Sequence, residues 1–245
     1  MISNIFNTIL LNPLVNVLVF LYAYIPGHDF GIAIVILTIC IRVIFIPLSI
    51  KTIVSQQSLA KVQPKLKELQ EKHKDNREAL GTATMSLYRE HNVNPLSGCL
   101  PLLIQFPVLI ALYKSLTVVF GSIEHITPLL YSFVPHPAVI NPLTLGLVDL
   151  TKPAIILAII AAALQFIQAR NSLTMQQKAG TADKNSPAQR MSSQMMYFLP
   201  FMILLISWRL PAGITLYWVV TTLFSIFEQH FIYRRYATAP ATKLP

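Results

Sequence analysis

Five stretches of the sequence are apolar over about the length that a helix needs to cross a bilayer. A transmembrane helix takes roughly 20 mostly apolar residues. The stretches that reach or approach this length are residues 28–50, 98–120, 153–170, 195–210 and 211–233. Hydrophobic residues make up 54% of the 245-residue chain and charged residues only 12%, whereas soluble domains average about 25% charged residues. The sequence therefore predicts an all-α integral membrane protein with five transmembrane helices.

The N-terminal segment, residues 1–27, is apolar as well, but polar residues interrupt it. Four asparagines lie within it: Asn4, Asn7, Asn12 and Asn16. A Pro26-Gly27 break follows its last aromatic residues. This pattern favours an amphipathic helix that lies in the membrane interface. A sixth full span is the alternative.

The lysines and arginines indicate the orientation of the chain. Fifteen of the 19 gather in three segments: residues 51–97, residues 171–194 with Arg170 at the edge, and the tail 234–245. Only Lys152 and Arg209 fall on the opposite side, and the other two lie within predicted spans. Because cytoplasmic loops carry an excess of basic residues, we expect these three segments in the cytoplasm. The N-terminus and the loop of residues 121–152 are then extracytoplasmic, and the C-terminus is a short basic cytoplasmic tail.

The segment 51–97 is the largest polar piece, and its apolar residues recur at helical steps of three and four. They form two runs: Leu59, Val62, Leu66 and Leu69, then Leu80, Thr84, Leu87 and Tyr88. A polar break at Lys74-Asp75-Asn76 separates the runs, which predicts a cytoplasmic hairpin of two helices. A solvated linker without function, or a basic face that lies against anionic lipid head groups, would give the same pattern.

Arg42 is the most informative single residue, because it lies inside the first predicted span. It precedes Lys51 by nine residues, or roughly 13 Å of helix. An arginine near a helix centre costs about 2.5–3.5 kcal/mol to insert, so it usually faces a partner or a water-filled cavity. Thr38 and Ser49 share its helix face. Snorkelling to the head groups is the alternative role.

The polar groups of the other predicted spans are mostly amides. They are Gln105 in the second span and Gln165 and Gln168 in the third. Apart from Asp29 at the start of the first span, the only acidic residue in the predicted spans is Glu228, near the end of the last one. An arginine placed among amides and hydroxyls predicts a water-filled cavity that binds an acidic group of another molecule. Each glutamine taken alone could instead bond between helices.

The chain shows no enzymatic motif. It has no Walker loop, no HExxH sequence and no Ser-His pair at helical spacing. Its two cysteines have no metal-ligand spacing. We therefore expect a protein that is not an enzyme and that uses no cofactor or metal.

Four segments carry a resemblance to a known family. They are IRVIFIPLSIKT (41–52), VQPKLKELQEKH (62–73), LYREHNVNPLSGCLPLLIQFPVLIALY (87–113) and LPAGITLYW (210–218). With them, essentially the whole chain resembles the YidC family of membrane protein insertases, also known as the YidC/Oxa/Alb family. We expect no large extracytoplasmic domain of the kind that many Gram-negative members carry.

The resemblance implies a five-helix insertase core around a hydrophilic groove that is open to the cytoplasm and the lipid. Arg42 matches the groove arginine. Gln105, Gln168 and the Tyr217-Trp218 pair fall where the family lines the groove or meets substrate. The segment 51–97 matches the mobile cytoplasmic hairpin, and its capture surface would use four basic residues: Lys61, Lys65, Lys67 and Arg77.

The implied function is an insertase and membrane chaperone without nucleotide hydrolysis. The groove takes up the polar, often acidic, tail of a newly made membrane protein, and the hydrophobic segment of that protein passes into the lipid. Membrane lipids are further implied partners, and no specific nucleic acid is implied. Whether the protein also binds a Sec-type translocon or the ribosome is left open by the sequence. The bacterial plasma membrane is the expected location. A small-solute transporter or channel and a lipid scramblase are the alternatives, because either could use the same groove.

Overall fold

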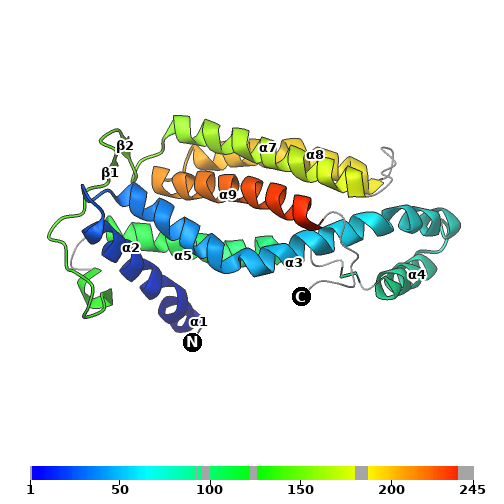
Figure 1. The fold of residues 1–245 in the computed structure, drawn as a ribbon, viewed down its shortest axis with the longest axis horizontal. Helices are drawn as coiled ribbons and strands as arrows, with labels where there is room; N and C mark the ends of the chain where they lie inside the picture. The colour runs from blue at the N-terminus through cyan, green and yellow to red at the C-terminus, as the bar shows by residue number, and fades with distance from the viewer. Residues whose placement is uncertain (1, 92, 95–99, 122–125, 180–186, 237–245) are drawn as a thin grey trace. The chain divides into compact units, whose positions relative to one another are not determined.

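The computed structural model describes residues 2–91, 93–94, 100–121, 126–179 and 187–236. These residues are mainly helical (Figure 1). The helices are α1 (Ile2–Phe6), α2 (Asn12–Tyr24), α3 (Phe30–Lys72), α4 (Arg77–Glu90), α5 (Leu100–Val119), α7 (Ile155–Ala179), α8 (Pro187–Ser207) and α9 (Ala212–Tyr236). A π-helical turn, Asn7–Leu11, joins α1 to α2, and a short 3₁₀ turn covers Thr127–Leu129.

The chain divides into two compact units. The first unit contains residues Met1–Ile44, Leu103–Gln165 and Pro200–Phe224, and the second contains Phe45–Leu102, Phe166–Leu199 and Ser225–Pro245. Five helices contribute residues to both units: α3, α5, α7, α8 and α9.

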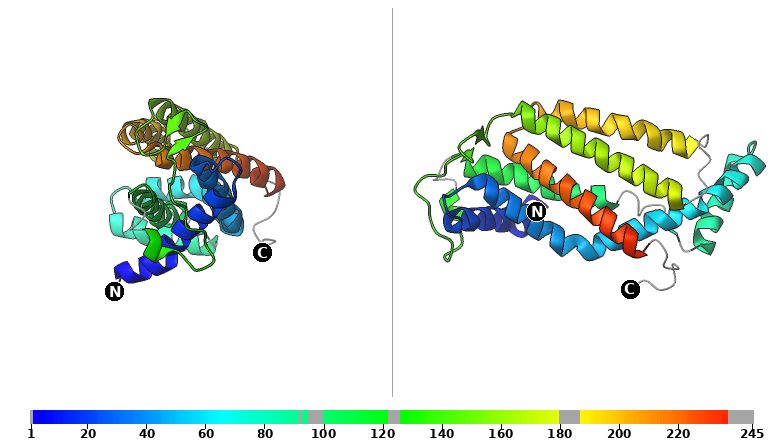
Figure 2. Two further views of the ribbon diagram at one scale, coloured as in Figure 1. Left: turned by 90° about the vertical axis from the view of Figure 1, so that its left-hand side faces the viewer. Right: turned by 45° about the horizontal axis from the view of Figure 1, so that its top comes forward.

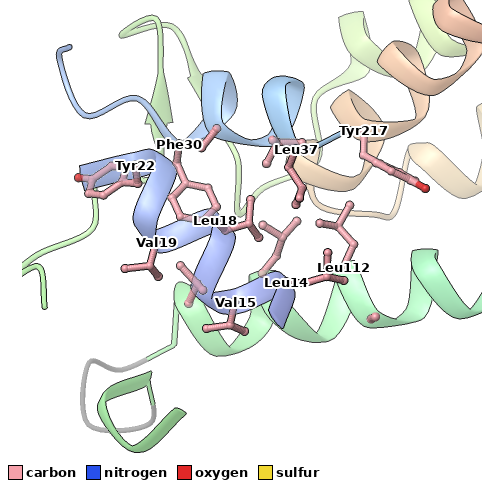
Figure 3. Packing of buried hydrophobic residues seen from close by; sticks show 14 of the residues in the cluster. Leu14, Val15, Leu18, Val19, Tyr22, Phe30, Leu37, Leu112 and Tyr217 are labelled. Atoms are coloured by element: carbon pink, nitrogen blue, oxygen red, sulfur yellow. The ribbon is translucent and has the colours of Figure 1, made fainter. Parts of the chain in front are cut away.

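The first unit has a continuous apolar core that α2, the start of α3, α5 and the start of α9 share. Leu18 and Val19 of α2, Phe30 of α3 and Leu112 of α5 are almost inaccessible to solvent. Figure 3 shows these side chains packed against one another. In Figures 1 and 2, α2 lies beside the first part of α3 and beside α5. This core holds the N-terminal helix firmly against two of the predicted spans.

The N-terminal helix is apolar on both faces. Its buried face carries Leu11, Leu14, Val15, Leu18, Val19 and Tyr22, and its exposed face carries Ile5, Ile9, Val17, Phe20 and Tyr24. Asn16, one of the asparagines that interrupt the apolar run, is buried; it donates to the Leu129 carbonyl at 2.8 Å and accepts from the Tyr131 N–H at 2.6 Å. By length and composition, Asn4–Tyr24 could cross a membrane. The interfacial position of this helix stays a prediction.

Two other helices among the described residues are long and apolar enough to cross a membrane: Phe30–Lys72 and Ile155–Met175. Two shorter apolar helices are Gln105–Val119 and Met196–Ser207. Helix α3 has 43 residues and continues through Pro47 and Pro64, so it is about twice as long as a span requires. Many large apolar side chains of α7 and α8 are exposed, among them Ile156, Ile159, Phe198, Phe201 and Leu205. Such a surface is expected for helices that face lipid.

A short antiparallel hairpin interrupts the loop before α7. Its strands are β1 (Leu143–Thr144) and β2 (Val148–Asp149), with Leu143 opposite Asp149 and Thr144 opposite Val148. The sequence did not predict these strands. The hairpin lies close to the start of α3, because a Cβ atom added at Gly31 would lie 2.1 Å from Thr144 Oγ1. Only glycine fits at this position.

The second unit contains the helical hairpin formed by the last part of α3 and by α4. These helices lie side by side in Figures 1 and 2. Val62, Leu87 and Val93 are buried between them, and Leu59, Leu66, Leu69 and Tyr88 pack around these three. Asn76 caps α4, since its side chain accepts a hydrogen bond from the Ala79 N–H at 3.0 Å. The first predicted apolar run and the end of the second, Leu87 and Tyr88, thus meet in one small core.

Candidate functional site

The candidate site is a cluster of polar side chains inside the first unit, built from α3, α5 and α9. Gln105 of α5 donates a hydrogen bond from Nε2 to the Tyr217 hydroxyl of α9 at 2.6 Å. Tyr217 is only 3% exposed. Arg42 of α3 lies close enough to Tyr217 for the two side chains to interact electrostatically. Three of the predicted site residues therefore come together, although the first and the last of them are 175 positions apart in the sequence.

Tyr217 connects this cluster to the apolar core. Its ring packs in the core with Leu37 and Leu112, and Figure 3 shows the ring leading away from these side chains with the hydroxyl at its far end. The apolar part of the ring is thereby buried while the hydroxyl reaches Gln105. Tyrosine suits such a boundary, because it has an apolar body and a polar tip.

Thr38 is buried one turn before Arg42 on the same face of α3. Its hydroxyl donates to the Ile34 carbonyl at 2.6 Å, so this donor is used within the helix. Arg42 itself is half-buried. The remaining predicted groove residues are also half-buried: Gln165 lies at the edge of the first unit, whereas Ser49 and Gln168 belong to the second unit.

Trp218 does not share the environment of Tyr217, although the two are adjacent in sequence. It packs with Leu164 against the cluster of Ala161, Ile203 and Val219 on α7, α8 and α9. Successive residues of an α-helix point about 100° apart, so neighbours in sequence face different surroundings. Trp218 therefore contacts the side of α9 that meets α7 and α8.

The sequence did not single out Thr221, which adds another hydroxyl near the cluster. It follows Tyr217 by four residues, lies close to the Tyr217 side chain and is 6% exposed. The step of four along an apolar helix is the signal that could have identified it. With Arg42, Gln105 and Tyr217 it gives a site that offers one positive charge and several neutral hydrogen-bonding groups.

At the end of the first unit where α3 begins, side chains bind the loop before α7. The Asp29 carboxylate accepts from the Thr144 hydroxyl and the Leu145 N–H, both at 2.6 Å, and from the Ile32 N–H at 3.0 Å. Tyr22 accepts from the Asn141 N–H at 3.0 Å. These bonds cover this end of the helices with ordered chain.

The start of α9 is bound to the same loop. The Ala212 N–H donates to the Lys152 carbonyl at 2.8 Å, and the Gly213 N–H donates to the Leu150 carbonyl at 3.0 Å. These bonds satisfy N–H groups that have no partner within their own helix. Nearby, the Thr151 hydroxyl and then the Lys152 ammonium donate to the Asp149 carboxylate and lower its pKa to about 2. The loop is thus held to α2, α3 and α9.

The four basic residues of the predicted capture surface lie on the hairpin of the second unit. Lys61, Lys65 and Arg77 are exposed, and Lys67 is half-buried. The Lys65 ammonium lies 3.0 Å from His91 Nε2, and the Lys67 ammonium lies 4.0 Å from Glu71 Oε1. Among the described residues, no group of three or more metal-ligating side chains lies together.

Comparisons with known proteins match most of the chain to one family model and to relatives that share one name. The family model described as 60Kd inner membrane protein matches residues 20–239. Membrane protein insertase YidC of Fusobacterium nucleatum is 36% identical over 207 residues, which cover 84% of this chain and 87% of that protein. Proteins of the same name from Magnetococcus marinus and Geotalea daltonii are 34% and 36% identical over 234 and 225 residues. These matches cover 95% and 91% of this chain but only 37% of each relative.

Proposed function

The chain belongs to the 60Kd inner membrane protein family, the family of the YidC insertases, and from this premise we propose that it inserts other proteins into the membrane. The relatives named above carry the name of membrane protein insertase. Apolar helices make the chain an integral membrane protein, and these relatives are bacterial. The proposed substrates are newly made membrane proteins with short, often acidic tails.

The observation that carries the proposed mechanism is the cluster of Arg42, Gln105 and Tyr217. A guanidinium in apolar surroundings attracts a carboxylate more strongly than it would in water, because the dielectric constant is lower. The Gln105 amide and the Tyr217 hydroxyl, which bond to each other, can exchange that bond for bonds to a polar peptide. The cluster would therefore lower the cost of bringing a substrate's polar tail into the bilayer.

The hydrophobic segment of the substrate would then move into lipid along the exposed apolar faces of α7 and α8. Burial of that segment in the hydrocarbon supplies the driving force, at roughly 25 cal/mol per Å² of apolar surface removed from water. The process as proposed needs no nucleotide hydrolysis and no cofactor. The same groups would make the protein a chaperone for segments that have not yet packed.

The proposed topology has five spans, which correspond to the first part of α3 and to α5, α7, α8 and α9. The basic residues favour an extracytoplasmic start for α3 and a cytoplasmic C-terminus. The bonds of Asp29 and Tyr22 to the loop support closure of the site on the extracytoplasmic side.

The hairpin of α3 and α4 would be the cytoplasmic capture surface. Lys61, Lys65 and Arg77 are exposed on it, so they can attract acidic substrate segments over about a Debye length, which is ≈ 8 Å at physiological salt. Contact with a ribosome or a Sec-type translocon would add to this role. The mechanism in the membrane requires neither partner.

Insertion by the purified protein alone tests the proposal. Proteoliposomes and empty liposomes receive a single-span substrate with an acidic N-terminal tail, and protection of the tail from added protease measures translocation. We expect protection only with the protein present. Circular dichroism shows whether the reconstituted protein is helical. With folded protein, protection no greater than in empty liposomes would contradict the proposal. Uptake of a small solute or flipping of a labelled lipid in the same vesicles would then favour a transporter or a scramblase.

A further inference from the structure

The hairpin tip, residues Leu143–Leu147, exposes three leucines although it lies outside the predicted spans. Leu143, Leu145 and Leu147 are 44%, 73% and 84% exposed. No Asp, Glu, Lys or Arg occurs between residues 126 and 148, so the tip itself carries no charged side chain. A surface of this kind on a loop is expected where an apolar environment covers it.

The backbone of the tip is unfavourable for leucine. Leu145 and Gly146 have φ angles of +51° and +67°, as in the two-residue turns that normally carry Asn-Gly or Asp-Gly. A leucine in this left-handed region is rare. The turn therefore displays an apolar side chain at a position where a small polar residue would fit better.

Two residues outside the hairpin, Asp29 and Tyr22, and one bond across its base hold the tip in place. Asp29 accepts hydrogen bonds from the Thr144 hydroxyl and the Leu145 N–H, both at 2.6 Å. Tyr22 accepts from the Asn141 N–H at 3.0 Å, and the Leu150 N–H donates to the Pro142 carbonyl at 2.9 Å. With these contacts on one side, the leucines point away from the protein.

Neighbouring residues indicate that the tip lies at the level of the membrane interface. Asp29, which contacts Leu145 directly, is the residue before α3. Trp208 and Arg209 follow the apolar helix α8 and are exposed; they come shortly before Ala212, whose N–H donates to the Lys152 carbonyl of the same loop. Tryptophan and basic residues at the ends of apolar helices are typical of the membrane interface.

We propose that the hairpin tip inserts Leu143, Leu145 and Leu147 into the boundary between head groups and acyl chains, in the leaflet where α3 begins. Lipid is the occupant favoured by the three exposed leucines, by the absence of charged residues from 126 to 148 and by the contact of the tip with the residue that precedes α3. The tip would fix the depth of this end of the first unit in the bilayer. The proposal does not depend on the insertase activity.

Fluorescence quenching in vesicles tests the proposal. In a background with Cys40 and Cys99 replaced by Ser, single cysteines replace Leu145 or Leu147 and carry the small fluorophore NBD. The full-length protein is reconstituted in phosphatidylethanolamine and phosphatidylglycerol. We expect lipids with a nitroxide near the head group to quench both probes about twofold, as for groups buried about 5–10 Å into the interface. Aqueous iodide should quench an exposed control, Asp75→Cys, far more.

Two other results would overturn the proposal. Strong iodide quenching with no effect of nitroxide lipids would mean that the tip is in water. Shielding from iodide without lipid quenching, lost when the protein is diluted in lipid, would mean that a second copy covers the tip.

A double variant tests whether the leucines anchor the tip in lipid, without disturbing the fold of the turn. Leu145→Asn together with Leu147→Asn removes the apolar tip, and asparagine tolerates the positive φ of position 145. With the probe at Leu143→Cys, we expect iodide access to rise about threefold while the helical signal is kept. Unchanged iodide access in the folded variant would contradict the proposal.

Discussion

Removing the Tyr217 hydroxyl should destabilise the protein by a predictable amount. Tyr217→Phe keeps the ring that packs in the core and deletes the acceptor of the 2.6 Å bond from Gln105. Hydrogen bonds between membrane helices contribute about 0.6 kcal/mol on average and up to about 1.7, whereas a buried group left without its partner costs about 1–3. Because Tyr217 is 3% exposed, we expect a loss of about 1–2 kcal/mol in the free energy of unfolding.

The pairing itself is measured by a double-mutant cycle with Gln105→Leu. Each single variant leaves one polar group without its partner, and the double variant leaves neither group. The double variant should therefore lose about 1 kcal/mol less of the free energy of unfolding than the sum of the losses in the two single variants. Reversible unfolding in mixed detergent micelles, followed by circular dichroism, gives the four free energies. Tyr113→Phe on α5 is the matched control, because Tyr113 is 45% exposed; its effect should stay within about 0.5 kcal/mol. Coupling near zero between positions 105 and 217 would refute the reasoning.

Two further predictions concern the loop contacts. Gly31→Ala should lower the unfolding temperature, because the added Cβ would lie 2.1 Å from Thr144 Oγ1 and overpacking costs about 1–3 kcal/mol. Gly81→Ala in α4 is the control and should not lower it, because a Cβ added there would meet no neighbouring atom within 4 Å. The pKa of Asp149 should be about 2 in the folded protein and rise in Lys152→Ala, as measured by NMR titration of its carboxyl group. Since this pKa is lowered on folding from 3.8, its contribution to stability is present above pH 3.8 and disappears as the pH falls through 2. A higher unfolding temperature for Gly31→Ala, or an unshifted Asp149 titration in both proteins, would contradict these expectations.

The sequence predicted the helical membrane class well, because long apolar runs leave few alternatives. It also gave the two apolar faces of the hairpin, since Leu59, Val62, Leu87 and Tyr88 follow the helical period. Such periodic signals are local. They need no knowledge of which segments meet in space.

The pairing within the site could not be predicted from local signals. Arg42 was identified by its cost in lipid, but the bond between Gln105 and Tyr217 joins residues 112 positions apart. Trp218 was grouped with Tyr217 by sequence alone, and the rotation of α9 separates their surroundings. Only the packing of the helices decides which polar side chains meet.

The closed end of the first unit was missed for a related reason. Asp29 resembles an ordinary acidic residue at the start of a helix, and its partners Thr144 and Leu145 lie about 115 residues away. Asn16 was noted only as one of the asparagines that interrupt an apolar run, and the loop backbone groups that bond its side chain lie more than 110 residues away. The strands of the hairpin have two residues each, which is too short for an alternating pattern.

A charge exchange between Arg42 and the substrate tests the central proposal most directly. Proteoliposomes with the wild type, Arg42→Lys or Arg42→Glu receive two substrates that differ only in an acidic or a basic tail. If Arg42 attracts the tail, Arg42→Glu should insert the acidic substrate at least about tenfold less well and the basic one better than the wild type does, and Arg42→Lys should keep most of the activity. Equal insertion of the acidic substrate by the wild type and Arg42→Glu would contradict the role proposed for Arg42.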